Sequence, residues 1–311
     1  MMKSITKNIK PNLFIVGASK CGTTALSEYL RSHPDIFVAK EKEVHYFCFD
    51  FNERYPRPRS INAYLDTYTR VRSERIIVDA SPWYLLSKDA IEAAYQFNPR
   101  ARFIAMVRSP FDMLPSLHRQ LINNGDEDQI DLLMAWRLQS KRLLGENIPA
   151  HCREEKILQY KKVCLLGEQI NVFFQTVPSE QRMVILLDDL KSSPRWVYKK
   201  VLSFLGLPDD GRSDFPVVNA SFHWRYKGFS EFVLKPPRTV EFAGAAILKL
   251  IGRDRIGLFR LLYHINNNFN RRQHERDPLP RTLLAELKQP FNSDIKLLGQ
   301  LLGRNLNGWL K

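Results

Sequence analysis

Hydrophobic and polar positions follow two patterns that alternate along the 311 residues of the chain. Short apolar runs occur at 13–17 ("LFIVG"), 75–82 ("RIIVDASP"), 102–110 ("RFIAMVRSP") and 182–190 ("RMVILLDDL"). After each run, apolar residues recur at helical spacing, as Leu26, Tyr29 and Leu30 do after the first. Apolar strands that alternate with amphipathic helices are typical of a parallel sheet with helices on both faces. The pattern therefore predicts an α/β fold of three layers.

The same pattern predicts a single domain over residues 1–311. We expect a core of about 11–234 and a helical extension of about 235–311 that packs back on it. Two largely helical stretches, about 127–144 and 154–175, lie between the third and fourth strands. We expect these stretches to border the functional site.

Charge and cysteine content narrow the classes of function. The net charge is +14, with both signs spread along the chain, which indicates an anionic ligand or surface. The four cysteines (Cys21, Cys48, Cys152, Cys164) have no CxxC spacing, so we expect neither a zinc site nor a disulfide framework. The N-terminal residues are polar, and no apolar run approaches the roughly 20 residues of a membrane span. These features predict a cytoplasmic protein and leave its oligomeric state open.

The stretch "GASKCGTTAL" directly follows the first apolar run. Glycines in such a loop let the backbone curl around phosphate oxygens, and the helix start attracts anions. The nucleotide-triphosphatase loop reads GxxxxGK[ST], and Gly17 and Gly22 keep its spacing. However, Thr23 stands at the lysine position, and Lys20 lies inside the loop. A kinase or nucleotide-triphosphatase variant, and an ordinary helix start with an exposed lysine, remain open alternatives.

A second anion-binding pattern stands at the end of the third apolar run. Arg108 ends the strand, and Ser109 as N-cap, Pro110 at the first helical position and Asp112 make a capping-box-like start. Ser116 lies about two helical turns beyond Arg108. A guanidinium and a helix hydroxyl in this order can hold one dianionic phosphate between them. A surface ion pair at Arg108 and a helix serine without a role would give the same pattern.

Together the two patterns resemble the sulfotransferase family that uses 3′-phosphoadenosine 5′-phosphosulfate (PAPS) as donor. The resemblance implies a P-loop-like fold and sulfuryl transfer without a metal ion. It assigns the loop to the phosphosulfate of the donor: Lys20, Cys21, Gly22, Thr23 and Thr24. It assigns the 3′-phosphate to Arg108 and Ser116, and to a later loop "RYKGF" with Arg225, Lys227 and Gly228. Lys20 would also stabilise charge on the leaving group.

The stretch "EVHYF" suggests the acceptor side. An extended backbone would place Glu43, His45 and Phe47 on one face. The stretch resembles the Glu-x-His-x-Phe sequence of the heparan-sulfate and carbohydrate branch of the family. The resemblance implies Glu43 as general base and His45 as a supporting catalytic group. A solvated charge run at Glu43 and a structural histidine are the alternatives.

The chain also departs from that branch. Ala80 stands where the branch commonly has a lysine, while Ser81 and Trp83 are candidates to line the acceptor cleft. No cysteine pair flanks "KGFSEF", so a bacterial-type cytoplasmic member is the better analogy. The acceptor is therefore expected to be a hydroxyl of a glycan, a glycolipid or a small metabolite.

A non-catalytic protein that binds polyanions or membranes is the alternative of another class. Residues 243–265 include "ILKLIGRDRIGLFRLLYHI", which as a helix would gather basic residues on one side and predicts peripheral membrane contact. No nucleic-acid-binding module is recognisable, and we expect no nucleic-acid partner.

Overall fold

The computed structural model describes residues 9–40, 43–218, 222–224, 271–273 and 278–310. Two compact units share the chain. One comprises Met1–Val218 with Leu279–Lys311, and the other is Asn219–Pro278. The predicted single domain and its boundaries stay a prediction.

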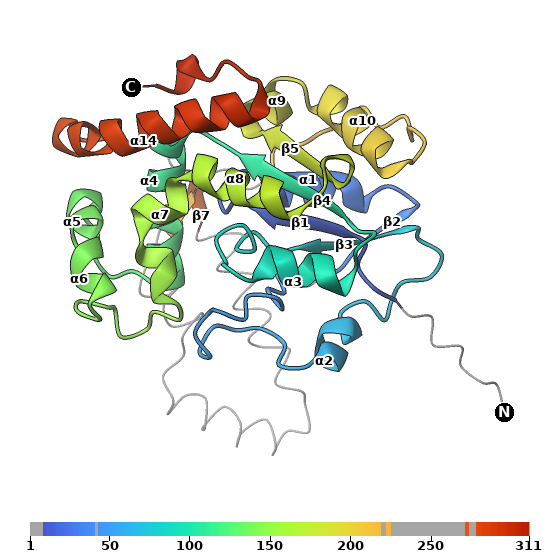
Figure 1. The fold of residues 1–311 in the computed structure, drawn as a ribbon, viewed down its shortest axis with the longest axis horizontal. Helices are drawn as coiled ribbons and strands as arrows, with labels where there is room; N and C mark the ends of the chain where they lie inside the picture. Colours follow the sequence, from blue (N-terminus) through green and yellow to red (C-terminus); the bar gives the residue numbers. More distant parts are fainter. Residues whose placement is uncertain (1–8, 41–42, 219–221, 225–270, 274–277, 311) are drawn as a thin grey trace. The chain divides into compact units, whose positions relative to one another are not determined.

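A five-stranded parallel sheet forms the centre of the first unit (Figure 1). Its strands are β1 (Leu13–Gly17), β2 (Ile36–Val38), β3 (Ile76–Ala80), β4 (Arg102–Val107) and β5 (Arg182–Leu186). They lie in the order β2-β3-β1-β4-β5, so the first strand of the sequence pairs with β3 and β4 in the middle. The predicted α/β, P-loop-like fold is confirmed.

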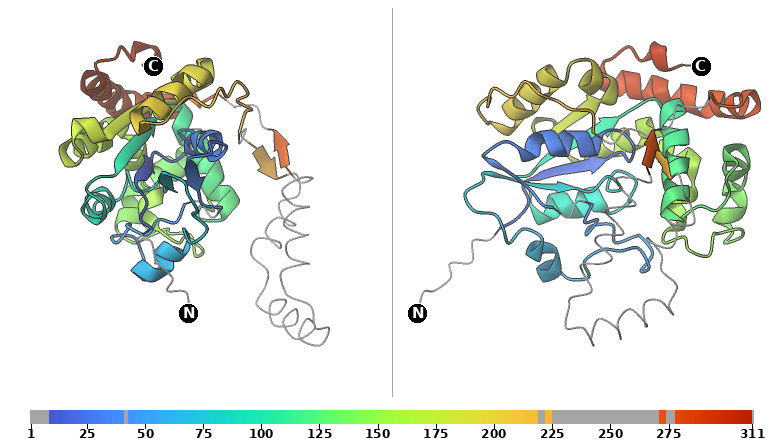
Figure 2. Two further views of the ribbon diagram at one scale, coloured as in Figure 1. Left: turned by 90° about the vertical axis from the view of Figure 1, so that its right-hand side faces the viewer. Right: turned by 180° about the vertical axis from the view of Figure 1, so that it is seen from behind.

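Helices cover both faces of the sheet, and its central strands consist mainly of apolar residues. The covering helices are α1 (Thr23–Arg31), α3 (Ala90–Phe97), α8 (Leu166–Thr176) and α10 (Pro194–Leu205). Helices α3 and α8 lie on one face, while α1 and α10 lie on the other (Figures 1 and 2). Every residue of β1 is buried, because a strand between two helical layers has no solvent-facing side.

Three local features differ from the sequence-based expectation. The fourth apolar run ends as a strand at Leu186, and α9 (Leu187–Ser192) follows directly. Asp188 and Asp189 in the first turn of α9 suit the positive end of the helix dipole. Strand β2 was not expected from the pattern, and residues 127–131 form no helix.

The inserted helical stretches are shorter pieces than predicted. They comprise α5 (Leu132–Arg137), α6 (Gln139–Leu143), a 3₁₀ helix (Glu155–Leu158), α7 (Tyr160–Cys164) and α8. Asp131 starts α5, because its carboxylate accepts a hydrogen bond of 2.8 Å from the backbone N–H of Met134. The remaining helices before the second unit are α2 (Ile61–Asp66), α4 (Pro110–Asn124) and a second 3₁₀ helix (Ser179–Gln181).

The C-terminal helix α14 (Arg281–Leu302) packs against α8 (Figure 1). The buried carboxylate of Asp294 accepts hydrogen bonds from the backbone N–H groups of Gly167 and Glu168, at 2.7 and 2.9 Å. These are N–H groups of the first turn of α8, which have no partner inside their own helix. A side chain of α14 therefore caps α8.

The second unit contributes two described strands, β6 (Phe222–Trp224) and β7 (Arg271–Gln273), which pair antiparallel. The predicted membrane-contact segment 243–265 lies outside the described residues. In the part of the chain that the structure describes, no helix has the length and apolar character needed to cross a membrane.

Candidate functional site

Three segments with predicted site residues lie at the carboxyl ends of adjacent strands. The glycine-containing loop follows β1, Ser81 follows β3, and Arg108 follows β4. Since β1 lies between β3 and β4 in the sheet, the three segments are neighbours. In open α/β sheets, ligands bind at this edge.

Two glycines allow the loop after β1 to pack closely. Gly17 has φ +145°, and a Cβ atom there would lie 2.6 Å from the carbonyl oxygen of Pro82. Gly22 is the N-cap of α1 with φ +93°, and its Cβ would lie 2.6 Å from a methyl group of Leu187. Both positions need a residue without a side chain. Thr23 and Thr24 follow as the first residues of α1, where backbone N–H groups have no intrahelical partner.

Lys20 lies in the same loop in the left-handed conformation, with φ 64°. Its carbonyl oxygen accepts a hydrogen bond of 3.2 Å from Nη1 of Arg108. Burial lowers the pKa of the Lys20 ammonium, and the positive charges of Arg108 and Arg119 lower it further, while Glu43 raises it. Lys20 therefore lies within electrostatic reach of two arginines and one carboxylate.

Arg108 is 5% exposed and stands at the start of α4. Ser109 is the N-cap and Pro110 the first helical residue, as predicted. The capping box does not form, because Ser109 makes no side-chain cap bond. Instead, the carboxylate of Asp112 lies 4.0 Å from Nη2 of Arg108. The same guanidinium donates to the carbonyl oxygen of Lys20, so Arg108 connects the start of α4 with the loop of Lys20.

Ser116 lies further along α4 and is half-buried. Arg119 follows three residues later, so the two side chains lie on neighbouring positions of one helix face. The positive charge of Arg119 also lowers the pKa of Lys20, and the sequence analysis did not single out this arginine. Its spacing from Ser116 was the signal that could have identified it.

Cys21 contributes packing rather than charge. Its side chain is buried, and its Sγ lies 3.8 Å from Sδ of Met113 on α4. Burial raises the pKa of the thiol to about 12, so it stays protonated at neutral pH. Any contact of Cys21 with an anion would therefore come from its backbone.

Glu43 and His45 lie in a loop beside β3, and their backbone is not extended. Both have positive φ angles, of 64° and 52°, so the expected alternation of side chains on one face is wrong. The Glu43 side chain is 43% exposed, whereas His45 is buried. The Glu43 carboxylate nevertheless lies 4.0 Å from Nε2 of His45. The two side chains are neighbours through the fold of the loop.

The imidazole of His45 is neutral at physiological pH. Burial lowers its pKa to about 3, because a charged ring would lose its hydration. The contact of 4.0 Å with Glu43 is therefore not an ion pair at neutral pH. His45 is a neutral hydrogen-bonding group next to an exposed carboxylate.

Ser81 and Trp83 do not present side chains for an acceptor. Ser81 is fully buried, and its hydroxyl accepts a hydrogen bond of 3.0 Å from the backbone N–H of His45. Trp83 is also buried and belongs to the apolar core. Ala80, where a lysine was expected by resemblance, accepts a hydrogen bond of 3.1 Å from the N–H of Glu43 through its carbonyl oxygen. Two groups at the end of β3 therefore accept hydrogen bonds from the backbone of the loop that carries Glu43 and His45.

Three predicted donor-site residues, Arg225, Lys227 and Gly228, lie outside the described residues. Across the described ranges, no group of three or more His, Cys, Asp or Glu side chains could hold a metal ion.

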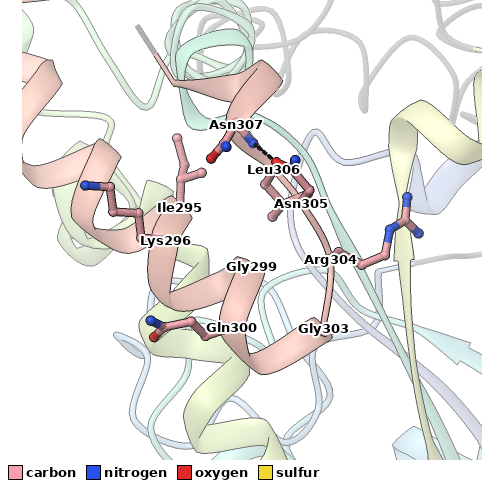
Figure 3. A pocket seen from close by; sticks show the side chains of 9 residues that line it. All are labelled: Ile295, Lys296, Gly299, Gln300, Gly303, Arg304, Asn305, Leu306 and Asn307. Atoms are coloured by element: carbon pink, nitrogen blue, oxygen red, sulfur yellow. Dashed lines mark hydrogen bonds between the residues drawn. The ribbon is translucent and has the colours of Figure 1, made fainter.

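A pocket of about 410 Å³ lies elsewhere, at the C-terminal end of α14 (Figure 3). Its lining includes Lys296, Gln300 and Arg304 and none of the predicted site residues. Arg304 is already engaged by Asp189 of α9, at 2.9 Å. This pocket is separate from the cluster of Lys20. The candidate site is therefore identified by its charged residues and by their place at the strand ends.

Comparison with known proteins identifies the family. The family model of the sulfotransferase domain matches residues 10–227. A solved structure, a sulfotransferase from Alicyclobacillus acidocaldarius, superposes with a TM-score of 0.70 at 24% identity, covering 97% of this chain and 99% of that one. The shared fold thus includes nearly all of both chains.

Curated relatives include heparan sulfate sulfotransferases. Heparan sulfate glucosamine 3-O-sulfotransferase 5 of Mus musculus is 24% identical over 64% of this chain and 54% of its own length. The membrane-associated sulfotransferase kil1 of Dictyostelium discoideum is 29% identical over 33% of this chain and 21% of its own. The chain thus spans about half or less of the length of these two relatives. The fold, the cluster at the strand ends and the family match agree: this chain belongs to the sulfotransferase domain family.

Proposed function

We propose that this protein transfers the sulfuryl group of PAPS to a hydroxyl group of a glycan, a glycolipid or a small metabolite. The observation that carries the proposal is one cluster at the strand ends. In it, Arg108 donates a hydrogen bond to the carbonyl oxygen of Lys20, and the negative charge of Glu43 raises the pKa of the Lys20 ammonium. Membership of the family supports sulfuryl transfer. The donor, the acceptor class and the residue roles are the proposed part.

The residues present fit an anionic donor of this shape. A Cβ atom at Gly17 would collide with the backbone of Pro82, and the positive φ of Gly22 disfavours a side chain there, so the two glycines allow the curled backbone of a phosphate-binding loop. Lys20 and the start of α1 would bind the phosphosulfate, while Arg108 and Ser116 would bind the 3′-phosphate. Arg225, Lys227 and Gly228 remain the proposed cover of the 3′-phosphate.

The proposed reaction is an in-line displacement at sulfur. Glu43 takes the proton of the acceptor hydroxyl, and the acceptor oxygen forms a bond to sulfur while the bond from sulfur to the phosphate oxygen breaks. Adenosine 3′,5′-bisphosphate leaves with that electron pair. Lys20 stabilises the negative charge that develops on the leaving oxygen. By analogy with phosphoryl transfer, positioning and charge stabilisation supply most of the catalysis.

His45 would assist as a neutral group. With a pKa of about 3, it cannot carry a useful positive charge at neutral pH. Its buried ring lies beside the carboxylate of Glu43, with Nε2 4.0 Å from Oε2, so its proposed role is to position that carboxylate. Glu43 remains the better base, because its carboxylate is exposed to an incoming acceptor.

The direct test is incubation of the purified protein with PAPS and a panel of hydroxylated acceptors. The panel should include N-sulfated and unsulfated glycans, glycolipids and small alcohols, with mass spectrometry to detect an added sulfuryl group. Lys20→Ala is the matched negative control. Sulfated product from the wild type alone supports the proposal. ATP hydrolysis with magnesium and no sulfated product would favour the nucleotide-triphosphatase alternative.

We also propose a cytoplasmic location. All four cysteines are free and buried, with no disulfide between them. Reduced cysteines are the rule in a cytosolic environment. Peripheral membrane contact through 243–265 stays a prediction, to be tested by flotation with liposomes.

A further inference from the structure

A buried carboxylate lies beneath the loop of Glu43. Asp79, the fourth residue of β3, is 1% exposed. Its Oδ1 accepts a hydrogen bond from Ser81 Oγ at 2.6 Å. Its Oδ2 accepts hydrogen bonds from the hydroxyls of Tyr64 and Tyr84, at 2.8 and 2.9 Å. One carboxylate thus accepts hydrogen bonds from three hydroxyl groups.

The direction of these hydrogen bonds follows from the backbone above them. The N–H of His45 donates to Ser81 Oγ at 3.0 Å, and the N–H of Phe47 donates to the hydroxyl of Tyr84 at 3.5 Å. An amide N–H can only donate, so each hydroxyl accepts a hydrogen bond from the loop and must donate its own to another group. Asp79 accepts the hydrogen bonds of both hydroxyls. An ionised carboxylate is the side chain that accepts at every position.

The pKa of the Asp79 carboxyl group is raised, because the effect of burial exceeds that of the hydrogen bonds from Ser81, Tyr64 and Tyr84, which lower it. An amide in place of the carboxylate would bring N–H donors to hydroxyls that already need an acceptor. At least one hydroxyl proton or one backbone N–H would then lack a partner.

The loop above needs such support, because its backbone is strained. Glu43 and His45 are both left-handed, at φ 64° and 52°, and non-glycine residues in this region cost free energy that the surroundings must offset. Three hydrogen bonds hold the loop to the end of β3. They run from the N–H groups of Glu43, His45 and Phe47 to Ala80 O, Ser81 Oγ and the Tyr84 hydroxyl.

We propose that Asp79 is a positioning residue of the enzyme: through Ser81 and Tyr84 it holds the loop 43–47 so that the carboxylate of Glu43 stands where the acceptor hydroxyl must lose its proton. This inference rests on the proposed role of Glu43 as base. Asp79 touches neither donor nor acceptor and acts only through the loop.

The test compares two variants of buried tyrosines. Tyr84→Phe removes the bond of 2.9 Å to Asp79 and the acceptor of the Phe47 N–H, whereas Tyr198→Phe, on α10, removes one bond of 2.9 Å to Asp210. Both rings are fully buried, so Tyr198→Phe controls for loss of stability. Turnover is measured as release of adenosine 3′,5′-bisphosphate from PAPS, with the best acceptor of the panel or with water.

We expect Tyr84→Phe and Ser81→Ala to lower kcat by about 10- to 100-fold, as small misplacements of catalytic groups do. The Kd for adenosine 3′,5′-bisphosphate should stay within about 2-fold, because the cations of the donor site are not part of this network. Tyr198→Phe should keep kcat. Ser81→Thr retains the hydroxyl and should recover part of the loss. Equal kcat values for Tyr84→Phe and Tyr198→Phe would overturn the inference.

A double-mutant cycle with Glu43→Gln separates this inference from the proposed function. If Ser81 acts by positioning Glu43, then Ser81→Ala costs much less kcat when Glu43 is already glutamine. Normal turnover of Glu43→Gln alone would refute the base role. Collapse of Glu43→Gln with normal turnover of Ser81→Ala would refute the positioning role alone.

Amide hydrogen exchange tests the network without any acceptor. Ser81→Ala should speed exchange of the backbone N–H of His45, and Asp79→Asn should speed exchange at both His45 and Phe47, while Tyr198→Phe leaves these amides unchanged. Unaltered exchange at 43–47 in Asp79→Asn would show that Asp79 does not hold the loop.

Discussion

Arg108 donates a hydrogen bond of 3.2 Å from Nη1 to the carbonyl oxygen of Lys20, across 88 residues of sequence. The bond joins the loop after β1 to the start of α4. The residue that accepts it, Lys20, has a left-handed backbone with φ 64°. This hydrogen bond therefore links the two proposed anchors of the donor. One anchor is for the phosphosulfate, and the other is for the 3′-phosphate.

Lys20→Ala should reduce the rate of transfer far more than the affinity for donor. Its side chain is proposed to stabilise charge that appears only as the bond to sulfur breaks, so kcat should fall on the order of 10²-fold or more. The carbonyl that accepts from Arg108 belongs to the backbone and remains in the variant. Single-turnover kinetics with PAPS and calorimetry with adenosine 3′,5′-bisphosphate separate the two effects. Equal losses in rate and affinity would contradict this role.

Arg108→Lys should weaken binding of adenosine 3′,5′-bisphosphate by about 10- to 100-fold, which is what loss of one or two hydrogen bonds to a charged group costs. Lysine keeps the charge but not the forked donor geometry. Adenosine 5′-monophosphate lacks the 3′-phosphate and should bind wild type and variant alike. Calorimetry with both ligands measures this difference. A parallel loss for both ligands would indicate a collapsed loop instead of a lost phosphate contact.

Glu43→Gln should keep the affinity for adenosine 3′,5′-bisphosphate while kcat falls by on the order of 10²-fold or more, the usual contribution of a general base. Glutamine has nearly the same shape and retains the backbone N–H that donates to Ala80. Steady-state kinetics with the best acceptor of the panel provides the measurement. Near-normal turnover would move the base elsewhere, and His45 would be the next residue to test.

Lowering the pH should destabilise the protein partly through His45. Its folded pKa is about 3, below the ordinary 6.5, so between these values the unfolded chain binds a proton that the native state does not. Stability therefore falls as the pH is lowered from about 6.5 toward 3, and this contribution is constant above that window. Urea denaturation at several pH values should show a smaller pH dependence for His45→Asn than for wild type. A His45 imidazole that titrates near pH 6.5 by NMR would be inconsistent with its burial.

Gly167→Ala should loosen the contact between α8 and α14. A Cβ atom there would lie 2.5 Å from the carbonyl oxygen of Asp294 and 2.7 Å from its Oδ1. Overpacking of this kind costs about 1–3 kcal/mol of unfolding free energy. Gly308→Ala is the matched control, because no atom lies within 4 Å of its added Cβ. Equal urea midpoints of the two variants would show that α14 adjusts without cost.

Several departures from the sequence-based expectation have local physical causes. The apolar run at 182–190 does not reveal where β5 ends. Leu187 and Leu190 belong to α9 but are buried like the end of the strand, so the sequence stays apolar across the boundary. The alternation in "EVHYF" suggested an extended segment. Glu43 and His45 are left-handed there instead, and their N–H groups donate hydrogen bonds to acceptors at the end of β3.

The sequence by itself determined the alternation of strands and helices, the glycine loop after β1 and the arginine after β4. Each of these follows from periodicity, glycine content or helix-start residues within a short window. The tertiary structure alone decided that Arg108 bonds to Lys20 and that Asp79 accepts hydrogen bonds from Ser81 and Tyr84, which bond to the loop of Glu43. These relationships depend on the strand order β2-β3-β1-β4-β5, which brings distant segments to one sheet edge. No local pattern encodes which partner a buried polar group will find there.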